Sequence, residues 1–510
     1  MKEPSPQVPS AGGGPAEVKP AGGPPPEKRS IAFYIHCAIG IFFMFIFGHV
    51  VEPVGTLTPV GMQILGVFIG SIYMWAIVNI LWPAILAMVA LGFTDHATLA
   101  GVIRTGMGDP FVATIIFTMI LFGAVEHSGV ARYISRWFLT RKLINGKPLA
   151  FSFVFIYCTF IISTIAGPIP AILMMWAILY AVLGEIGYTK SDTYSKVMVV
   201  GVFFGGIAGQ AAIPFTGSAF AIVGIFSATT GLSISFTAYI IFGFIMATLN
   251  MLIYTLLIKY LFRPDVNKLA AVTTEMFERE PLPPMNKQQK ILLAAVGAFL
   301  VGVMAPGIVP EGTLWFTDIL GSLGVWGVTM LLVVALIVVN VDGRAVLDFK
   351  EIIGKYVMWP IVFMFAAIMP LAAALVSPDA GIREMMVVIF EPILGGQSAT
   401  GFSAITLVVA VIVTQLANNV IVGTLLTPII YLFGVPLGVN LAALATCMIF
   451  VIHLSMLLPA ATAMTPLLWG NREWVSVGDI MRYCIPITVL SLLMFIIIGI
   501  PLSNLIFSLF

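Results

Sequence analysis

Two adjacent asparagines, Asn418 and Asn419, lie in the middle of the apolar stretch that runs from Val413 to Pro428. A side-chain amide without a partner in hydrocarbon is unfavourable by several kcal/mol, so this pair is expected to face protein, water or a bound solute. Gly423 and Pro428 interrupt the stretch further along. The pattern predicts two half-helices that meet at a tip near the asparagines.

Three other apolar runs are interrupted in a similar way. The runs 150–184, 197–225 and 438–470 each contain glycine or proline near their centre. A helix broken at the midplane of a bilayer leaves free N–H groups and about half a positive charge at the start of its second piece. Four such helix starts would bind an anion without any charged side chain. The residues expected to contact the solute are Asn418, Asn419, Gly167, Pro168, Thr462, Thr465, Thr216, Ser218 and Gln210.

The ends of the first pieces present carbonyl oxygens instead of N–H groups. These oxygens suit a small cation such as Na⁺, which we expect near Ser163, Thr164 and Thr414. No aspartate or glutamate falls at a predicted mid-span position, which disfavours a cation/proton exchanger because such proteins generally need a membrane carboxylate. His453 is the titratable group expected deep in a span, so it is the candidate for proton coupling.

Each of these residues also has a purely structural interpretation. The asparagine pair would join helices through amide hydrogen bonds, which are worth about 1 kcal/mol in membrane bundles. Gly167 and Pro168 would form a kink, and Ser or Thr hydroxyls commonly bond the backbone of their own helix. His453 would be a buried histidine with satisfied hydrogen bonds. The four cysteines lie in or beside apolar runs without CxxC spacing, which is typical of packing residues.

The composition excludes the soluble classes of protein. The 510 residues are 60% hydrophobic and 9% charged, with a mean hydropathy of +1.08, whereas soluble domains carry about 25% charged residues. The chain is therefore expected to be an all-α polytopic membrane protein. Its net charge of +1 gives no indication of a nucleic-acid partner. The five scattered histidines, with no HExxH, GxSxG or carboxylate pair, give no support for an enzyme.

Apolar runs of about 17 to 25 residues place the transmembrane helices. We expect about 11, near 31–50, 57–75, 77–92, 109–127, 197–225, 235–262, 289–305, 316–340, 356–376, 438–470 and 482–508. The stretches 150–184 and 400–433 are too long for one span and too short for two with a loop. Both have helix-breaking residues at the centre, so they are predicted to be re-entrant hairpins surrounded by protein or a cavity.

The chain divides into two similar halves. We assign 1–29 to a disordered cytoplasmic tail, 30–261 to the first half, 262–289 to a cytoplasmic connecting loop and 290–510 to the second half. Arg383 lies 251 positions after Arg132, and Asn418 lies 251 positions after Gly167. Clusters of basic residues place the N-terminus on the cytoplasmic side of the cell (plasma) membrane. The two hairpins would then enter the membrane from opposite sides. The halves are therefore predicted to form an inverted repeat.

The order of spans, hairpins and breaks over residues 31–508 resembles the divalent anion:sodium symporter family, the dicarboxylate, citrate and sulfate transporters of INDY type. The motifs that carry the resemblance are Asp109-Pro110, Thr414-Gln415-Leu416, Leu458-Pro459-Ala460-Ala461-Thr462, and the closing Trp469-Gly470 to Ile480-Met481-Arg482. The resemblance implies an elevator-type transporter, usually a homodimer. Its hairpins and broken spans would carry Na⁺ and a carboxylate or sulfate.

The hairpin tips depart from the pattern of that family. Its tips usually carry Ser-Asn-Thr, whereas the matching positions here are Gly167-Pro168-Ile169 and Asn418-Asn419-Val420. The Thr-Pro-Pro-Asn signature of its broken span is Thr462-Ala463-Met464-Thr465 in this chain. A site with fewer hydroxyls and a more apolar lining suggests a less densely charged organic anion.

We therefore expect a secondary active transporter of a small organic anion that is coupled to Na⁺ and needs no other cofactor. Its partners are the anion and the lipid bilayer, and its assembly is a homodimer. A proton-coupled or exchange mechanism at His453 is the alternative within transport. A passive anion channel and a membrane-embedded enzyme are the alternatives of another class, and both are disfavoured.

Overall fold

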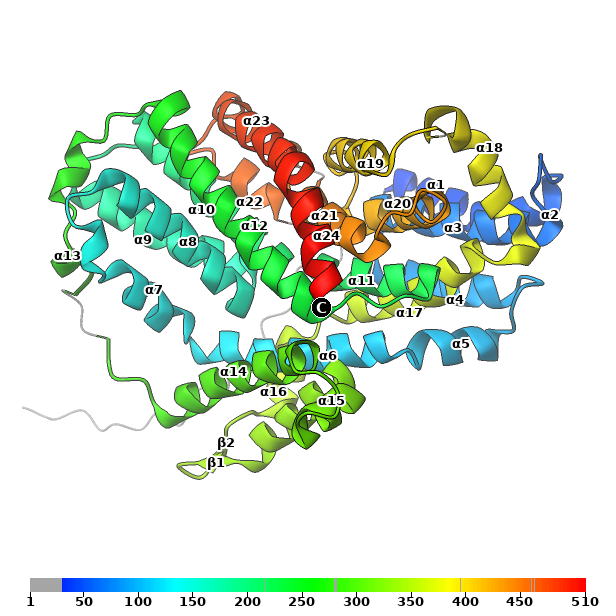
Figure 1. The fold of residues 1–510 in the computed structure, drawn as a ribbon, viewed down its shortest axis with the longest axis horizontal. Coiled ribbons are helices and arrows are strands. Elements are labelled where there is room, and N and C mark those ends of the chain that lie inside the picture. Colours follow the sequence, from blue (N-terminus) through cyan, green and yellow to red (C-terminus); the bar gives the residue numbers. More distant parts are fainter. Residues whose placement is uncertain (1–29, 216, 279–281, 395, 460, 463) are drawn as a thin grey trace, which may run out of the picture.

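The computed structural model describes residues 30–510 except 216, 279–281, 395, 460 and 463. The predicted tail 1–29 and the predicted solute residue Thr216 therefore lie outside the described residues. The described chain is almost entirely helical (Figure 1), with one short antiparallel pair of strands, β1 (Asn340–Val341) and β2 (Arg344–Ala345). This confirms the all-α class.

Among the described residues, ten helical segments are long and apolar enough to cross a membrane, or eleven if α16 and α17, bent by 71°, count as one span. The helices before the connecting loop are α1 (Ile31–Phe42), α2 (Gly48–Val50), α3 (Pro59–Ile77), α4 (Leu81–Gly92), α5 (Leu99–Met107), α6 (Pro110–Ser128), α7 (Ala131–Leu139), α8 (Pro148–Ala166), α9 (Pro168–Glu185), α10 (Thr193–Ala212), α11 (Gly217–Thr230) and α12 (Phe236–Leu257). The helices within and after the connecting loop are α13 (Thr274–Glu278), α14 (Lys287–Ile308), α15 (Trp315–Val338), α16 (Phe349–Tyr356), α17 (Trp359–Leu375), α18 (Ile382–Leu394), α19 (Ala399–Val413), α20 (Asn419–Gly434), α21 (Leu441–Ile452), α22 (Thr465–Gly470), α23 (Val477–Met494) and α24 (Ile500–Leu509).

Side chains fix where many of these helices begin. Thr58, Ser235 and Ser398 each accept a hydrogen bond from the backbone N–H three residues further on, at the starts of α3, α12 and α19. Proline occupies the first position of α6, α8 and α9, where its missing N–H has no helical partner to lose. Such local signals explain why several expected spans, such as 109–127 and 235–262, begin within a few residues of the observed helices.

The two hairpin stretches each contain a pair of helices. α8 and α9 have 19 and 18 residues, so each is long enough to cross a bilayer, whereas α19 and α20 have 15 and 16. Re-entrant insertion of both pairs therefore stays a prediction. The run 438–470 is not a continuous span, because α21 ends at Ile452 and α22 begins at Thr465.

The apolar side chains form two cores. The first core joins helices α8–α10 and α12 of the first half to α19–α24 of the second half. The second core joins α3–α6 of the first half to α14–α17 of the second half. Each core thus combines helices from both halves, and α11 lies between the cores because Ile222 and Phe226 belong to the first and Phe220 and Ile225 to the second.

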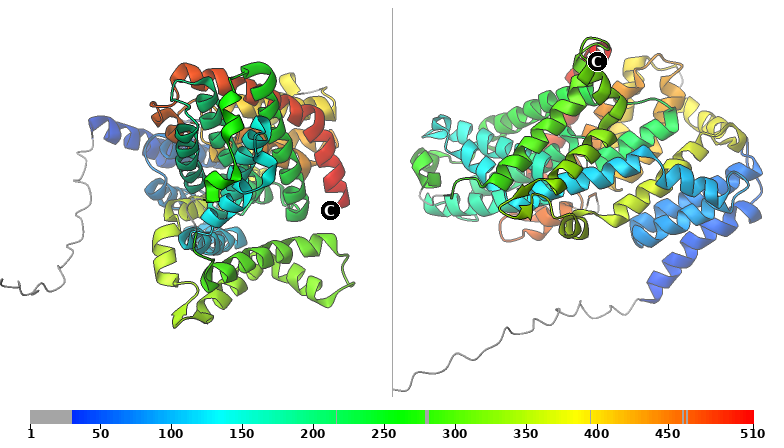
Figure 2. Two further views of the ribbon diagram at one scale, coloured as in Figure 1. Left: turned by 90° about the vertical axis from the view of Figure 1, so that its left-hand side faces the viewer. Right: turned by 90° about the horizontal axis from the view of Figure 1, so that it is seen from below.

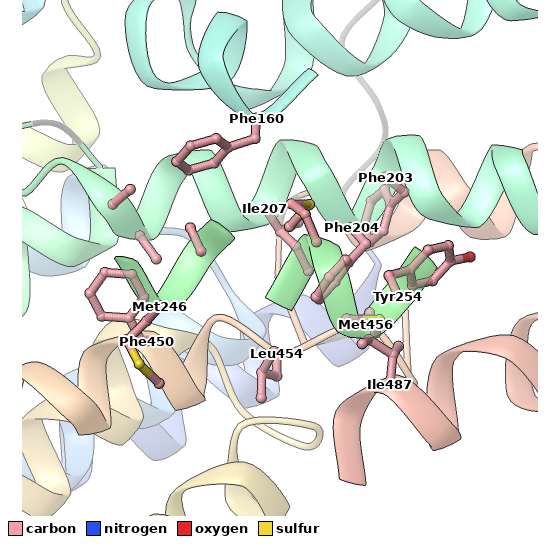
Figure 3. Packing of buried hydrophobic residues seen from close by; sticks show 14 of the residues in the cluster. Phe160, Phe203, Phe204, Ile207, Met246, Tyr254, Phe450, Leu454, Met456 and Ile487 are labelled. Carbon is pink, nitrogen blue, oxygen red and sulfur yellow. The ribbon is translucent and has the colours of Figure 1, made fainter. Parts of the chain in front are cut away.

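Individual spans differ in how much of their surface is buried inside the protein. In Figure 2, α14 and α15 project to one side of the molecule. Only 28% of the most apolar 18-residue stretch of each of these helices is buried. The most apolar 18-residue stretch between Thr193 and Thr230, over α10 and α11, is 89% buried. Figure 3 shows part of the first core, where Leu454 and Met456, from the segment after α21, lie among Phe204, Ile207 and Phe450.

Candidate functional site

The tip of the second hairpin consists of residues 414–418, between α19 and α20. Asn418 is exposed and caps α20, since its Oδ1 accepts a hydrogen bond of 2.9 Å from the Val420 N–H. Asn419 is 2% exposed. The Thr414 hydroxyl lies 2.9 Å from Asn419 Oδ1 and 2.8 Å from the Ile452 carbonyl oxygen. Three oxygens thus meet with a single hydroxyl proton among them.

Gln415 follows in the same tip and was not among the predicted site residues. Its Nε2 donates to the carbonyl oxygens of Val411 and Leu454 at 3.0 and 3.1 Å, and its Oε1 accepts from the Leu457 N–H at 3.1 Å. The sequence indicates this residue by a further amide side chain, next to Thr414, in the same apolar run as the two asparagines. The tip is therefore bound at several points to the backbone that follows α21.

The tip of the first hairpin is the single residue Gly167, whose φ of 81° favours glycine, followed by Pro168 at the start of α9. The Ser163 hydroxyl donates to the Gly206 carbonyl of α10 at 2.6 Å. A Cβ atom on Gly209 would lie 2.5 Å from Ser163 Cβ. Helix α10 therefore approaches α8 more closely than any residue with a side chain would allow.

The two broken spans meet at a hydrogen bond between Ser218 and His453. The Ser218 hydroxyl, at the start of α11, lies 2.9 Å from His453 Nε2, which is just past the end of α21. His453 Nδ1 lies 2.6 Å from the Ile449 carbonyl oxygen. A carbonyl only accepts, so Nδ1 carries a proton, and in the neutral ring Nε2 accepts from Ser218. The residue therefore joins the two halves of the chain as a neutral, satisfied histidine.

The segment 453–464 separates α21 from α22, and its described residues, 453–459, 461, 462 and 464, form no regular helix. Near its end, the hydroxyls of Thr462 and Thr465 lie 2.8 Å apart, and the Thr465 hydroxyl lies 3.1 Å from the Ser455 carbonyl oxygen. Ser455 Oγ and Gln210 Oε1 are buried without a hydrogen-bond partner among the described residues. Buried polar atoms of this kind are expected to bind a ligand, an ion or water.

Three features of the structure bear on the expected site. α22 has six residues, so its start carries a smaller helix dipole than the starts of α11 and α20, with 14 and 16 residues. Among the described residues, no hydrogen bond joins Gly167 or Pro168 to the second hairpin. Thr164, expected near an ion, donates to the Ile161 carbonyl of its own helix at 2.7 Å.

A cluster of contacts near the end of α9 holds the first hairpin and the loop after it to the second half. The rings of Tyr180 and Trp474 stack with centroids 4.1 Å apart, and Asn471 Nδ2 donates to the Tyr180 hydroxyl at 2.6 Å. Lys190 Nζ lies 2.6 Å from Glu473 Oε2. This hydrogen bond and the positive charge of Lys190 hold the pKa of Glu473 below its ordinary value.

The polar groups of both breaks are therefore linked in one network. It runs from Thr414 and Gln415 through the segment after Ile452 to His453 and on to Ser218. Asn419, Thr462 and Thr465 border the same segment, whereas Ser163 belongs to the separate contact between α8 and α10. The network consists of neutral groups, which suits a solute that brings its own charge.

Comparisons with known proteins agree with this picture of a membrane transporter. A family model described as "Citrate transporter" matches residues 71–451. Among solved structures, the chain is similar to the YdaH transporter of Alcanivorax borkumensis, with 14% sequence identity and a TM-score of 0.54. That likeness covers 80% of this chain and 87% of the other, and it shows a shared fold. No curated protein matches the chain.

Proposed function

Because the chain belongs to the citrate transporter family, we propose that it is a secondary transporter that moves a small organic anion across the membrane together with Na⁺. The observation that carries this proposal is the hydrogen bond between Ser218 and His453. It brings the breaks of two spans from opposite halves together inside an apolar protein. Helix starts and hydroxyls gathered in this way attract an anion and keep it away from lipid.

The anion would be held by N–H groups and hydroxyls. The start of α20, at Asn418, is exposed, and the start of α11 carries Ser218. The Ser455 hydroxyl, which has no partner among the described residues, is available as a donor beside the breaks. This lining has no cationic side chain among the contacts described, which supports a less densely charged carboxylate. Citrate is the second candidate, because the family model favours it.

The coupling ion would lie at the second tip. The oxygens of Thr414, Asn419 and Ile452 meet there with one hydroxyl proton for two acceptors. A small cation prefers such a group of hydroxyl, amide and carbonyl oxygens. Na⁺ bound there would lie next to the exposed start of α20 and would strengthen its attraction for an anion. At −100 mV each excess cation would add about 2.3 kcal/mol to uptake.

The movement that carries the anion would be of the elevator type. The division into two cores supports this proposal, since both hairpins and the broken span α21–α22 belong to the first core. The helices of the second core would serve as a scaffold and as the surface of a homodimer. We further propose that the protein is a transporter of the divalent anion:sodium symporter type. It would lie in the plasma membrane with its N-terminus in the cytoplasm.

Proton coupling at His453 is the alternative that a specific observation favours. Protonation of Nε2 would make it a donor, so the Ser218 hydroxyl would accept from the ring and its own proton would turn toward the solute. Uptake that stays unchanged in His453→Ala would remove this alternative. Uptake that is driven by a pH gradient in the absence of Na⁺ would favour proton coupling over Na⁺ coupling.

The test is uptake into proteoliposomes that contain the full chain. Labelled monocarboxylates, dicarboxylates and citrate are offered with an inward Na⁺ gradient, with an inward proton gradient and with neither. We expect accumulation of a monocarboxylate with Na⁺. A preference for dicarboxylates contradicts the low charge density, and flux at channel rates without any gradient contradicts secondary transport.

A further inference from the structure

The side chain of Gln415 bonds backbone groups of two different elements. Its Nε2 donates to the carbonyl oxygens of Val411, near the end of α19, and Leu454, in the segment 453–464. Its Oε1 accepts from the N–H of Leu457 in the same segment. The residue is only 8% exposed. Both ends of the amide are therefore committed to positions on the backbone.

The partners of Gln415 also fix which way round its amide lies. Carbonyl oxygens only accept and a backbone N–H only donates, so the amide nitrogen must face the two carbonyls and the oxygen must face Leu457. A group that replaces glutamine here needs two donors and one acceptor at this reach. Carboxylate has no donor, methionine has neither, and asparagine is shorter by one methylene. The site is therefore specific for glutamine.

The first hairpin lacks a corresponding bond. Thr164 lies 251 positions before Gln415, and its hydroxyl donates to Ile161 of its own helix. The first tip reaches α10 through the Ser163 hydroxyl, whereas the second tip reaches the segment after α21 through both Thr414 and Gln415. The two halves therefore differ at this point.

Residues 453–459, the described start of this segment, depend on such side-chain bonds because they form no regular helix. They include His453, whose ring meets Ser218, and Ser455, whose hydroxyl is buried without a partner among the described residues. We propose that Gln415 is a positioning residue that holds this segment against the second tip, so that the groups from both broken spans keep the geometry that binds the anion. The inference rests on the proposed transport function and adds a residue to it.

Gln415→Glu tests the proposal through its dependence on pH. At about pH 8 the introduced carboxylate faces two carbonyl oxygens without a donor, and we expect a KM for uptake at least about tenfold above the wild type. Burial beside carbonyl oxygens favours the protonated carboxyl, which supplies one donor again, so at about pH 6 we expect a KM within roughly threefold of the wild type. His453 is the titratable group of the contacted segment, and each variant is therefore compared with the wild type at the same pH.

The matched control is Gln288→Glu, at the start of α14. Gln288 Nε2 also donates to a backbone carbonyl, that of Val346, at 2.8 Å. Gln288 lies on α14, however, a helix of the second core, whereas both hairpins belong to the first core. Its uptake should equal that of the wild type at both pH values. Gln415→Met should raise KM equally at both. If Gln415→Glu and Gln415→Met behave alike at both pH values, or if neither differs from the wild type, the proposal is wrong.

A second measurement does not require uptake. Met456 is fully buried beside the contacts of Gln415, so a cysteine introduced by Met456→Cys, in a chain with Cys37→Ser, should react slowly with a membrane-permeant maleimide. We expect Gln415→Met to increase the labelling rate at least tenfold and Gln288→Glu to leave it unchanged. Equal rates overturn the positioning role. If the wild type takes up no anion, the transport proposal fails, and labelling still decides whether Gln415 holds the segment.

Discussion

Ser218 Oγ and His453 Nε2 lie 2.9 Å apart, although the residues are separated by 235 positions in the chain. Each follows a helix break, one before α11 and the other after α21. Since Nδ1 of the ring is engaged by the Ile449 carbonyl, Ser218 supplies the donor that Nε2 needs. The two broken spans therefore depend on each other for the hydrogen bonding of their polar groups.

Ser218→Ala should weaken transport. The change leaves His453 Nε2 buried without a donor, and an unsatisfied buried acceptor is unfavourable by about 1–3 kcal/mol. We expect the KM for the transported anion to rise about tenfold, which corresponds to about 1.4 kcal/mol. The control is Ser508→Ala, because Ser508 is exposed and bonds the carbonyl of Leu505 in its own helix. Equal KM values for the two variants would show that the hydrogen bond has no part in the site.

Thr414→Val should destabilise the second tip. Valine keeps the shape of threonine but removes the hydroxyl that lies between Asn419 and Ile452. We expect a lower Tm of the purified protein and a weaker dependence of uptake on Na⁺. The loss of unfolding free energy should be about 1–3 kcal/mol.

The matched control for this variant is Thr406→Val on the same helix. Thr406 is buried and bonds the carbonyl of Phe402, within α19. Its Na⁺ dependence should stay that of the wild type, since the hydroxyl joins no second element. A Na⁺ dependence that is the same in both variants would remove Thr414 from the proposed ion site.

Gly209→Ala should separate the first hairpin from α10. The new Cβ would lie 2.5 Å from Ser163 Cβ and 2.6 Å from the Phe160 carbonyl oxygen, so one of the helices must move. Overpacking of this kind is unfavourable by about 1–3 kcal/mol. Thermal unfolding checks the change. Gly184→Ala is the control, because a Cβ there meets no atom within 4 Å, and it should leave Tm unchanged or slightly higher.

The ion pair between Lys190 and Glu473 should stabilise the protein only above the pH at which the carboxylate titrates. A carboxyl whose pKa is lower in the folded protein stabilises the fold above its unfolded pKa, and this contribution is lost as pH falls through the folded value. Glu473→Gln should therefore lower Tm slightly at pH 7 and leave it unchanged below about pH 3. Both groups are largely exposed, so the effect should also shrink in about 1 M salt.

Trp474→Ala provides the contrast to this pH dependence. It removes the ring that stacks on Tyr180 at 4.1 Å, an interaction between uncharged groups. Its decrease in Tm should be the same at both pH values. An equal decrease for Glu473→Gln at pH 7 and at the lower pH would mean that the pairing with Lys190 does not stabilise the fold.

Local signals were sufficient to predict the helices of this chain. Apolar runs gave the approximate number of membrane spans, and glycine, proline and asparagine marked positions where helices end, such as Gly167 and Asn418. These features depend on residues a few positions apart, so a single sequence contains them. The early end of α21 at Ile452 was less visible, because the residues that follow it are mostly apolar.

The contacts across the chain could not be predicted in the same way. Nothing local to Ser218 indicates that His453 supplies its partner, since that pairing depends on how two distant spans pack. Gln415 was passed over because its role follows from the backbone groups of Leu454 and Leu457, which any residue could present. The structure was needed to show which polar residues share one network.

The central claim is that the groups joined by Ser218 and His453 form the anion site of a secondary transporter. The most direct test is the steady-state accumulation of a labelled carboxylate by the wild-type chain and by Ser218→Ala in the same proteoliposomes, under an inward Na⁺ gradient. We predict that the wild type concentrates the anion above its external level, that accumulation collapses when the gradient is dissipated, and that Ser218→Ala requires about tenfold more anion for the same initial rate. Accumulation that never exceeds the external level under any gradient, or identical concentration dependence in both proteins, would contradict the claim.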